Sequence, residues 1–194
     1  MQIAGLDMRI IAGEFRGRKL LGPQTEATRP ITDRVKQSLF DILSPRIEGA
    51  VVYDLFAGTG SMGLECLSRG ARRVEFFEAE RSAVARLRKN LAALGVSGEK
   101  GVVHGGDLMR LFAGGNAGGD DLADLIFLDP PYRFLRERAE ELRALGEKLA
   151  ARLNSDGVVV FRHDSRDSLE LPGLRCFDRR EYGSMGIEFL RRGE

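Results

Sequence analysis

The chain has 194 residues, of which 43% are hydrophobic and 30% charged, and its formal net charge is +1. That is enough chain to bury the core of one ordinary globular domain, and the near-zero charge gives no sign of a polyanionic partner for the molecule as a whole. Apolar runs are far shorter than the ~20 residues of a membrane span and no secretory signal is recognisable, so we expect a cytoplasmic protein without a membrane partner. Cys66 and Cys176 lie far apart without metal-binding spacing, which predicts two reduced, packed thiols and no metal site.

The first 36 residues hold a local excess of basic side chains. Residues 9–23 contain two short apolar segments around a turn bounded by Gly13 and Gly17, a pattern that predicts a β-hairpin. The basic residues of this region that could contact a substrate are Arg9, Arg16, Arg18, Lys19, Arg29 and Arg34. Such a hairpin is either a sheet edge protected by charge or an arm that contacts nucleic-acid phosphates, and the segment alone favours the first interpretation.

A polar stretch over residues 24–32 is followed by a predicted helix. Thr32 is placed to cap it, and Leu43 ends it before a Ser-Pro pair. Arg34 and Lys36 are expected to lie off the face that packs against the core. The apolar residues spaced to form that face are Val35, Leu39, Ile42 and Leu43.

From residue 50 onward strands alternate with helices. The predicted strands are 51–55, 74–77, 102–106, 124–128 and 157–161, and the predicted helices include 61–69, 82–94 and 135–152. Regular alternation of this kind produces a parallel sheet covered on both faces, with any ligand at the carboxyl ends of the strands. The last forty residues break the pattern, because Leu174–Phe177 and Gly186–Leu190 predict a terminal hairpin.

A glycine-rich loop follows the first of these strands, and it contains a G-x-G-x-x-G pattern formed by Gly58, Gly60 and Gly63. With Glu78 further along the chain, this is literally the pattern of NAD binding. Two details argue against NAD. Asp54 would place a carboxylate near the pyrophosphate, where positive potential is needed, and the bulky Phe56 lengthens the loop before its first glycine. An acid beside the loop instead suits S-adenosylmethionine, which carries an amino group and a sulfonium but no phosphate.

Acidic residues end three successive strands. Asp54 would favour the ammonium group of the cofactor, Glu78 would accept from the ribose hydroxyls, and Asp107 would accept from the adenine amino group. The loop residues expected to contact the cofactor through a close backbone approach are Phe56, Ala57, Gly58 and Gly60. The alternative interpretation is that all three acids only cap helices, which is common.

The strand over residues 124–128 runs directly into Asp129, Pro130, Pro131 and Tyr132. Because proline has no N–H donor and pushes the preceding residue towards an extended backbone, the carbonyl groups of Asp129 and Pro130 are expected to project unpaired. A carboxylate, a carbonyl and an aromatic ring in four residues could hold a flat group that bears an amino function. On these four residues alone, a strand followed by a Pro-Pro turn explains the pattern equally well.

Both motifs resemble those of the amino-methyltransferases that act on exocyclic or amide nitrogen, namely Asp54-Leu-Phe-Ala-Gly-Thr-Gly-Ser61 and Asp129-Pro-Pro-Tyr132. The segments Arg9–Lys19 and Thr28–Lys36 are in addition similar to the RsmD family, which methylates N2 of a guanine in bacterial 16S ribosomal RNA. The resemblance extends from about Arg9 to the terminal hairpin. The glycine-rich insertion over residues 114–121 departs from it.

This resemblance implies an α/β, Rossmann-like class I S-adenosylmethionine-dependent methyltransferase with a seven-stranded, mostly parallel sheet, a terminal antiparallel hairpin and a small N-terminal hairpin/helix extension. It implies an RNA-binding extension over residues 1–27 and a catalytic domain over residues 28–194. The implied substrate is 16S rRNA, free or within an assembling 30S particle, with the target base unpaired or flipped and the basic hairpin on the flanking phosphates. The protein would act as a monomer.

Alternatives remain open at the level of sequence. The Asp-Pro-Pro-Tyr motif serves adenine N6, cytosine N4 and glutamine amide nitrogen as well as guanine N2. An NAD-dependent oxidoreductase would be stabilised by NADH in place of S-adenosylmethionine, and a cofactor-free RNA-binding module would be stabilised by neither.

Overall fold

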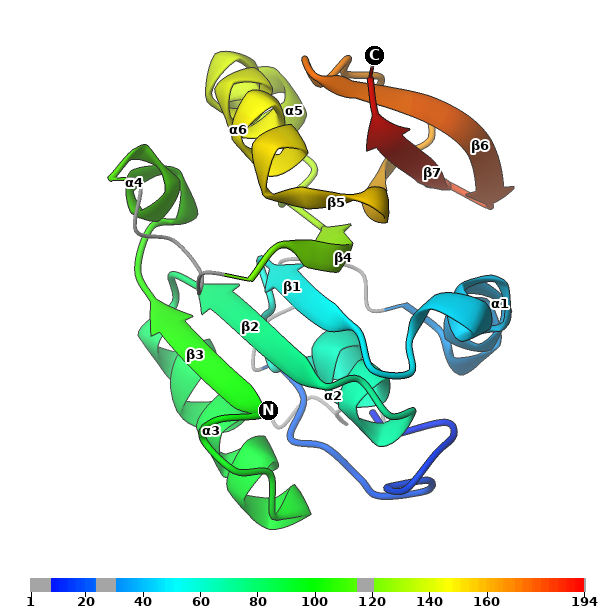
Figure 1. The fold of residues 1–194 in the computed structure, drawn as a ribbon, viewed down its shortest axis with the longest axis vertical. Helices are drawn as coiled ribbons and strands as arrows, with labels where there is room; N and C mark the ends of the chain where they lie inside the picture. Colours follow the sequence, from blue (N-terminus) through cyan, green and yellow to red (C-terminus); the bar gives the residue numbers. More distant parts are fainter. Residues whose placement is uncertain (1–7, 24–30, 115–120, 194) are drawn as a thin grey trace, which may run out of the picture.

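A seven-stranded sheet of order β3-β2-β1-β4-β5-β7-β6 forms the middle layer of the protein, seen in Figure 1. The computed structural model describes residues 8–23, 31–114 and 121–193, so Arg29 and the predicted domain boundary after residue 27 lie outside it. Its strands are β1 (Val51–Leu55), β2 (Arg73–Glu78), β3 (Gly101–Gly105), β4 (Ala123–Leu128), β5 (Leu153–Asp164), β6 (Leu174–Tyr182) and β7 (Met185–Arg192). Strands β1 to β5 pair in parallel, and β7 is antiparallel to β5 and β6. The predicted α/β fold with a terminal antiparallel hairpin is confirmed.

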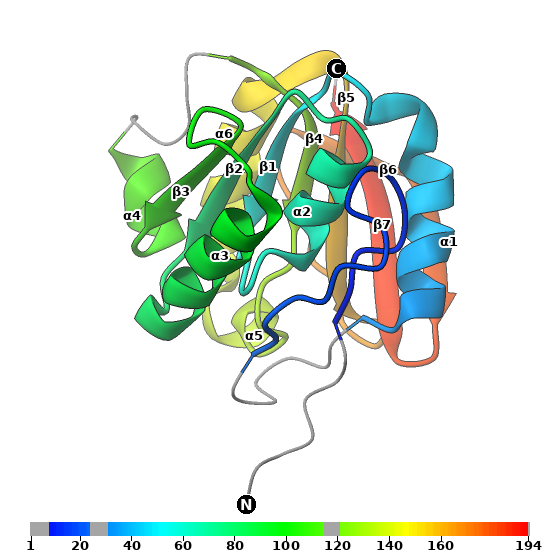
Figure 2. The same cartoon turned by 90° about the horizontal axis from the view of Figure 1, so that it is seen from below.

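Helices cover both faces of the sheet, as Figure 2 shows. One face carries α1 (Asp33–Leu43), a 3₁₀ turn η1 (Ser44–Arg46), α2 (Ser61–Ser68) and α3 (Arg81–Leu94). The other face carries α4 (Leu108–Ala113), α5 (Phe134–Glu137) and α6 (Ala139–Arg152). Two apolar clusters, one on each face, form the core. Burial of this kind is the main favourable contribution to folding.

The N-terminal segment forms the predicted hairpin and packs on the first of these faces. Arg9 and Lys19 form an antiparallel bridge, and the neighbouring Ile10 and Leu20 belong to the same apolar cluster as helices α1, α2 and α3. The N–H groups of Ile11 and the following alanine donate to the carboxylate of Glu65 in α2, at 2.8 and 3.0 Å. The hairpin is therefore held by both apolar burial and backbone hydrogen bonds.

The predicted packing face of helix α1 was partly wrong. Thr32 caps the helix as expected, accepting from the N–H of Val35 at 3.4 Å. However, Lys36 is buried at 3% exposure, whereas Ile42 is 39% exposed. The packed stripe includes Lys36 because its ammonium group pairs with a buried carboxylate of another helix, Glu65, at 2.9 Å.

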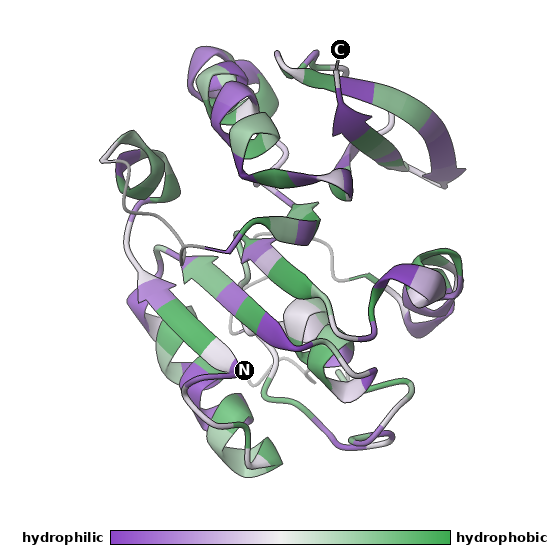
Figure 3. Cartoon of the chain, in the orientation of Figure 1, coloured by the Kyte–Doolittle hydropathy of each residue, from purple (hydrophilic) through white to green (hydrophobic). Residues whose placement is uncertain are grey.

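Two further predictions were wrong in detail. The helix expected over residues 135–152 is broken at Arg138, whose backbone (φ −132°, ψ 33°) leaves the helical region and separates α5 from α6. Cys66 is a buried free thiol as expected, but Cys176 is exposed, because it lies on the edge strand β6, none of whose residues is buried. Figure 3 shows broad hydrophilic bands along this strand. Within the described part of the chain, no helix has the length and apolar character required to cross a membrane.

Candidate active site

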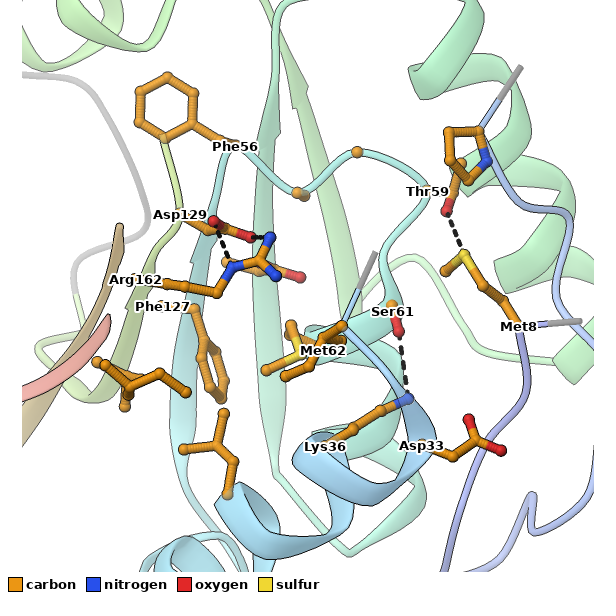
Figure 4. Close-up of a pocket in the computed structure, with 18 of the residues that line it drawn as sticks. Met8, Asp33, Lys36, Phe56, Thr59, Ser61, Met62, Phe127, Asp129 and Arg162 are labelled. Atoms are coloured by element: carbon orange, nitrogen blue, oxygen red, sulfur yellow. Dashed lines mark hydrogen bonds and ion pairs between the residues drawn. The ribbon is translucent and has the colours of Figure 1, made fainter. Parts of the chain in front are cut away.

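A pocket opens at the carboxyl ends of the central strands, between the sheet on one side and helix α1 with the hairpin on the other, and Figure 4 shows its lining. Six of the residues predicted from sequence line it: Arg9, Asp54, Phe56, Ala57, Gly58 and Asp129. Glu78 is joined to this group by a hydrogen bond to the N–H of Gly58. Asp107 lies apart, after β3. The structure thus brings the glycine loop and the acid that follows β4 to one cavity.

The loop between β1 and α2 combines tight packing with one open position. Gly60 has φ 87°, and a Cβ there would lie 2.4 Å from Cδ1 of Leu87. Gly58 has φ 56°, and a Cβ there would meet no atom within 4 Å. Phe56 adopts φ 61°, which is rare for a bulky residue. Its ring packs edge-on against the ring of Phe134, with 5.9 Å between the two ring centroids. Gly58 is therefore the loop glycine at which a ligand can approach the backbone.

Asp54 connects the end of β1 to the first turn of α2. Its carboxylate is 3% exposed and accepts from the N–H of Gly63 at 2.8 Å. Burial raises the pKa of Asp54 to about 8, the negative charges of Asp129 and Glu78 add to this shift, and the hydrogen bond from Gly63 opposes it. The predicted contact with an ammonium group stays a prediction, and it would place a cation beside a carboxyl group that is desolvated in the free protein.

The other two strand-end acids also have partners within the protein. Glu78 accepts from the N–H groups of Gly58 at 2.8 Å and of Glu80 at 2.7 Å, so it fixes the glycine loop. Asp107 caps α4, and Arg138 donates to its second oxygen at 3.3 Å. Although desolvation works in the opposite direction, these hydrogen bonds lower the pKa of Asp107. The helix-cap interpretation thus describes Asp107, while Asp54 and Glu78 organise the loop.

Sequence reasoning missed the side chain closest to Asp129. Arg162, 9% exposed, lies within the buried run of β5, directly after Phe161, which pairs with Leu128 at the end of β4. Its Nε donates to Oδ1 of Asp129 at 2.7 Å, a second N–H donates to Oδ2, and Figure 4 shows both contacts. A side-on pair of this kind fixes the plane of the carboxylate. A cation directly after an apolar strand was the only available signal in the sequence.

The remaining residues of the motif after β4 lead into helix α5. Pro130 is buried and Tyr132 is half-buried. The carbonyl of Pro131 accepts from the N–H of Phe134 at 2.7 Å, and that of Tyr132 accepts from the N–H of Leu135 at 3.3 Å. None of the three residues after Asp129 lines the pocket.

Lys36 also lines the pocket and was not predicted to do so. Its Nζ lies 2.9 Å from Oε2 of Glu65, and it donates at 3.2 Å both to Oγ of Ser61 and to the carbonyl of Arg9. Burial lowers the pKa of Lys36, although Glu65 opposes this shift. This buried ion pair joins α1, α2 and the hairpin at one side of the cavity, where Figure 4 shows Lys36 facing Ser61.

The predicted substrate-binding cations occupy the hairpin and the start of α1. Arg9 forms an exposed ion pair with Asp33 at 2.8 Å, and Arg18 donates to the carbonyl of Ala93 in α3 at 2.7 Å. The side chains that are exposed at the surface here are Arg9, Arg16, Arg18, Lys19 and Arg34. Of these five, only Arg9 also lines the pocket.

The strand order, the glycine loop after β1 and the acid after β4 define a Rossmann-like methyltransferase fold. The family model described as "Conserved hypothetical protein 95" matches residues 8–191, and the chain belongs to this family, the RsmD family.

Individual proteins resemble the chain in sequence and in structure. Ribosomal RNA small subunit methyltransferase D from Haemophilus influenzae is 43% identical over 138 residues, 70% of each chain. The solved structure described as "Putative methyltransferase yhhF from Escherichia coli" superposes with a TM-score of 0.79 at 29% identity, over 96% of this chain and 99% of that one. SMU.776, described as "a putative methyltransferase complexed with SAH", shares the fold alone, at 12% identity and a TM-score of 0.64, over 80% of this chain and 48% of that one.

Proposed function

We propose that the protein is an S-adenosylmethionine-dependent rRNA methyltransferase that modifies the exocyclic N2 of a guanine in 16S rRNA. The observation on which this rests is that Asp129 and the open backbone of Gly58 line the same pocket, so a methyl donor and an amino group could meet there. The name of the relative from Haemophilus influenzae supports a ribosomal RNA substrate. The resemblance to the RsmD family supports guanine N2 as the acceptor.

The residues present fit the cofactor. The space beside Gly58 admits a ligand against the backbone, and Asp54 offers a carboxylate to an ammonium group. Glu78 lies at the end of the next strand, where an acid can accept from ribose hydroxyls. Bound S-adenosylmethionine would supply an electrophilic methyl group. The Asp107 side chain, engaged with α4 and Arg138, has fewer lone pairs left for the adenine amino group.

Asp129 is the central residue for the acceptor. The lone pair of a guanine amino group is delocalised into the ring, so hydrogen bonds to the Asp129 carboxylate and the Pro130 carbonyl would favour the pyramidal, nucleophilic form as positive charge develops. Tyr132 is half-buried and outside the pocket lining, so its side chain would have to turn towards the pocket to stack on the base and hold it in line. Arg162 acts as a positioning residue, because its paired N–H groups fix the orientation of the Asp129 carboxylate. No base is required, since the methylated nitrogen is acidic enough to lose its proton to water.

The experiment is methyl transfer from labelled S-adenosylmethionine to 30S particles that lack the modification, followed by nucleoside analysis of the 16S rRNA. We expect label in N2-methylguanosine, and no transfer by Asp129→Ala although this variant still binds the cofactor. Label in N6-methyladenosine, N4-methylcytidine or protein glutamine would overturn the assignment of the acceptor. Stabilisation by NADH in place of S-adenosylmethionine would overturn the reaction class.

A further inference from the structure

Helix α3 carries a set of cations that the proposed active site does not use. They are Arg81, Arg86, Arg88 and Lys89, and no acidic residue lies in the same helix. Among the residues that the structure describes, none of the four forms an ion pair, whereas arginines of the other sheet face do, such as Arg143 with Glu140 and Arg133 with Glu137. Apart from the N-cap residue Glu80, the cations of α3 therefore have no acidic neighbour in the helix and no ion-pair partner among the described residues.

These cations face away from the sheet. The buried side of α3 is apolar and includes Leu87 and Leu91, which belong to the core cluster on this face. Arg81, Arg88 and Lys89 are exposed. The helix thus presents a basic outer surface on a rigid, well-packed base.

The stability of the helix does not explain these charges. A cation at the first helical position, where Arg81 lies, is opposed by the positive end of the helix dipole. Arg86 and Lys89 are three residues apart, and like charges at this spacing repel by a few tenths of a kcal/mol. An unpaired basic surface that costs local stability fits an anionic partner better than a purely structural role.

The basic hairpin is joined directly to this helix. Arg18 donates to the carbonyl of Ala93 at 2.7 Å. Asn90, 3% exposed, accepts from the N–H of Leu21 at 2.8 Å and donates to the carbonyls of Leu21 at 3.2 Å and Thr59 at 3.0 Å. One buried amide therefore links the hairpin, α3 and the glycine loop, and Figure 2 shows hairpin and helix on the same side of the sheet.

We infer that the outer surface of α3 binds RNA phosphates and forms one continuous RNA-binding surface with the hairpin. The inference rests on the proposed function, because it assigns a further contact surface to the same RNA substrate. Exposed cations on a rigid helix suit a phosphate backbone through charge alone, without reading its sequence. The surface would hold the segment that flanks the target nucleotide on the side of β2 and β3.

The test is the salt dependence of binding to a 16S rRNA transcript between 50 and 200 mM KCl. Arg88→Gln with Lys89→Gln removes two exposed cations and keeps good helix propensity. Its control, Arg110→Gln with Arg143→Gln, removes the same charge from helices on the opposite face of the sheet.

If each cation contacts one phosphate, we expect the α3 variant to reduce the slope of log affinity against log salt by about 1.4. Extrapolated from 1 M salt, this change corresponds to about 25-fold weaker binding at 100 mM. The control is expected to keep the slope of the wild type, and both variants are expected to keep wild-type affinity for S-adenosylmethionine. Equal slopes in the two variants, with methyl transfer intact in the wild type, would overturn this inference alone. A wild-type protein that neither binds nor methylates 16S rRNA would overturn the proposed function as well.

Discussion

The affinity for S-adenosylmethionine is expected to depend on pH through Asp54. Burial, with the charges of Asp129 and Glu78, raises the pKa of this carboxyl group to about 8 in the free protein. At pH 7 such a group is about nine-tenths protonated. An ammonium group placed beside it favours the carboxylate, so its pKa falls in the complex and binding releases a proton.

The sign and size of the effect follow from linkage. Because the pKa of Asp54 is higher in the free protein than in the complex, affinity weakens as pH falls below about 8 and approaches a tenfold loss per pH unit. Between pH 8 and pH 6.5 the loss is about 15-fold if the bound carboxyl group stays ionised throughout. Above pH 8 the Asp54 contribution levels off.

Calorimetry in two buffers of different ionisation enthalpy measures the protons released, and we expect close to one at pH 7. Asp54→Asn is the matched control, because its amide oxygen can still accept from the N–H of Gly63 and the cofactor keeps its own titration. The variant is expected to bind more weakly at pH 8 and to lose the part of the pH dependence that Asp54 contributes, while the part due to the amino group of the cofactor remains. Identical profiles for the two proteins would show that no cation approaches Asp54, and the assignment of this residue would fail.

Three further predictions concern neighbouring residues. Arg162→Gln is expected to lower kcat about 30-fold, equivalent to ~2 kcal/mol of charge-assisted hydrogen bonding, while KM for the cofactor is kept. The double variant Arg162→Gln with Asp129→Asn should have the same kcat as Asp129→Asn alone. Additive losses of kcat in the double variant would contradict a positioning role. Gly58→Ala should weaken cofactor binding, measured by calorimetry, and change Tm only slightly. Gly63→Ala would place a Cβ 2.4 Å from the Phe76 ring and should mainly lower Tm. A large loss of Tm in Gly58→Ala with unchanged cofactor affinity would refute the open position at Gly58. Glu65→Gln leaves a buried ammonium unpaired and should cost about 3 to 5 kcal/mol in urea unfolding, and a loss below 1 kcal/mol would be inconsistent with this burial.

The sheet could be predicted because its signals are local. Each parallel strand contains a short apolar run with an acidic or glycine residue at or next to its carboxyl end, and each following helix has an apolar stripe of its own. The terminal hairpin was likewise visible as two apolar segments around a turn, although its strands β6 (Leu174–Tyr182) and β7 (Met185–Arg192) proved longer than predicted. Alternation of this kind specifies the order of the elements along the chain, and the rules of βα connection largely specify the sheet.

The site was less predictable because its ion pairs join distant segments. Lys36 meets Glu65 and Arg162 meets Asp129 only after the sheet has formed, across separations of 29 and 33 residues. A charged residue in an apolar stripe is read from sequence as exposed, since buried charges are rare unless paired. The same rule, applied after the fold is known, identifies these two cations as residues whose partners must lie nearby.

The two loop-organising acids, Asp54 and Glu78, show why local pattern alone could not assign their roles. A carboxylate has about four lone-pair sites, and hydrogen bonds to the backbone occupy only part of them. Glu78 uses one oxygen for Gly58 and the other for Glu80, and the residue is only half-buried. An acid of this kind builds the glycine loop in the absence of ligand and can still accept from a ribose hydroxyl. Glu78→Gln is therefore expected to affect both functions, because the amide can replace only one of the two accepting oxygens; loss of cofactor affinity without any loss of thermal stability would separate them.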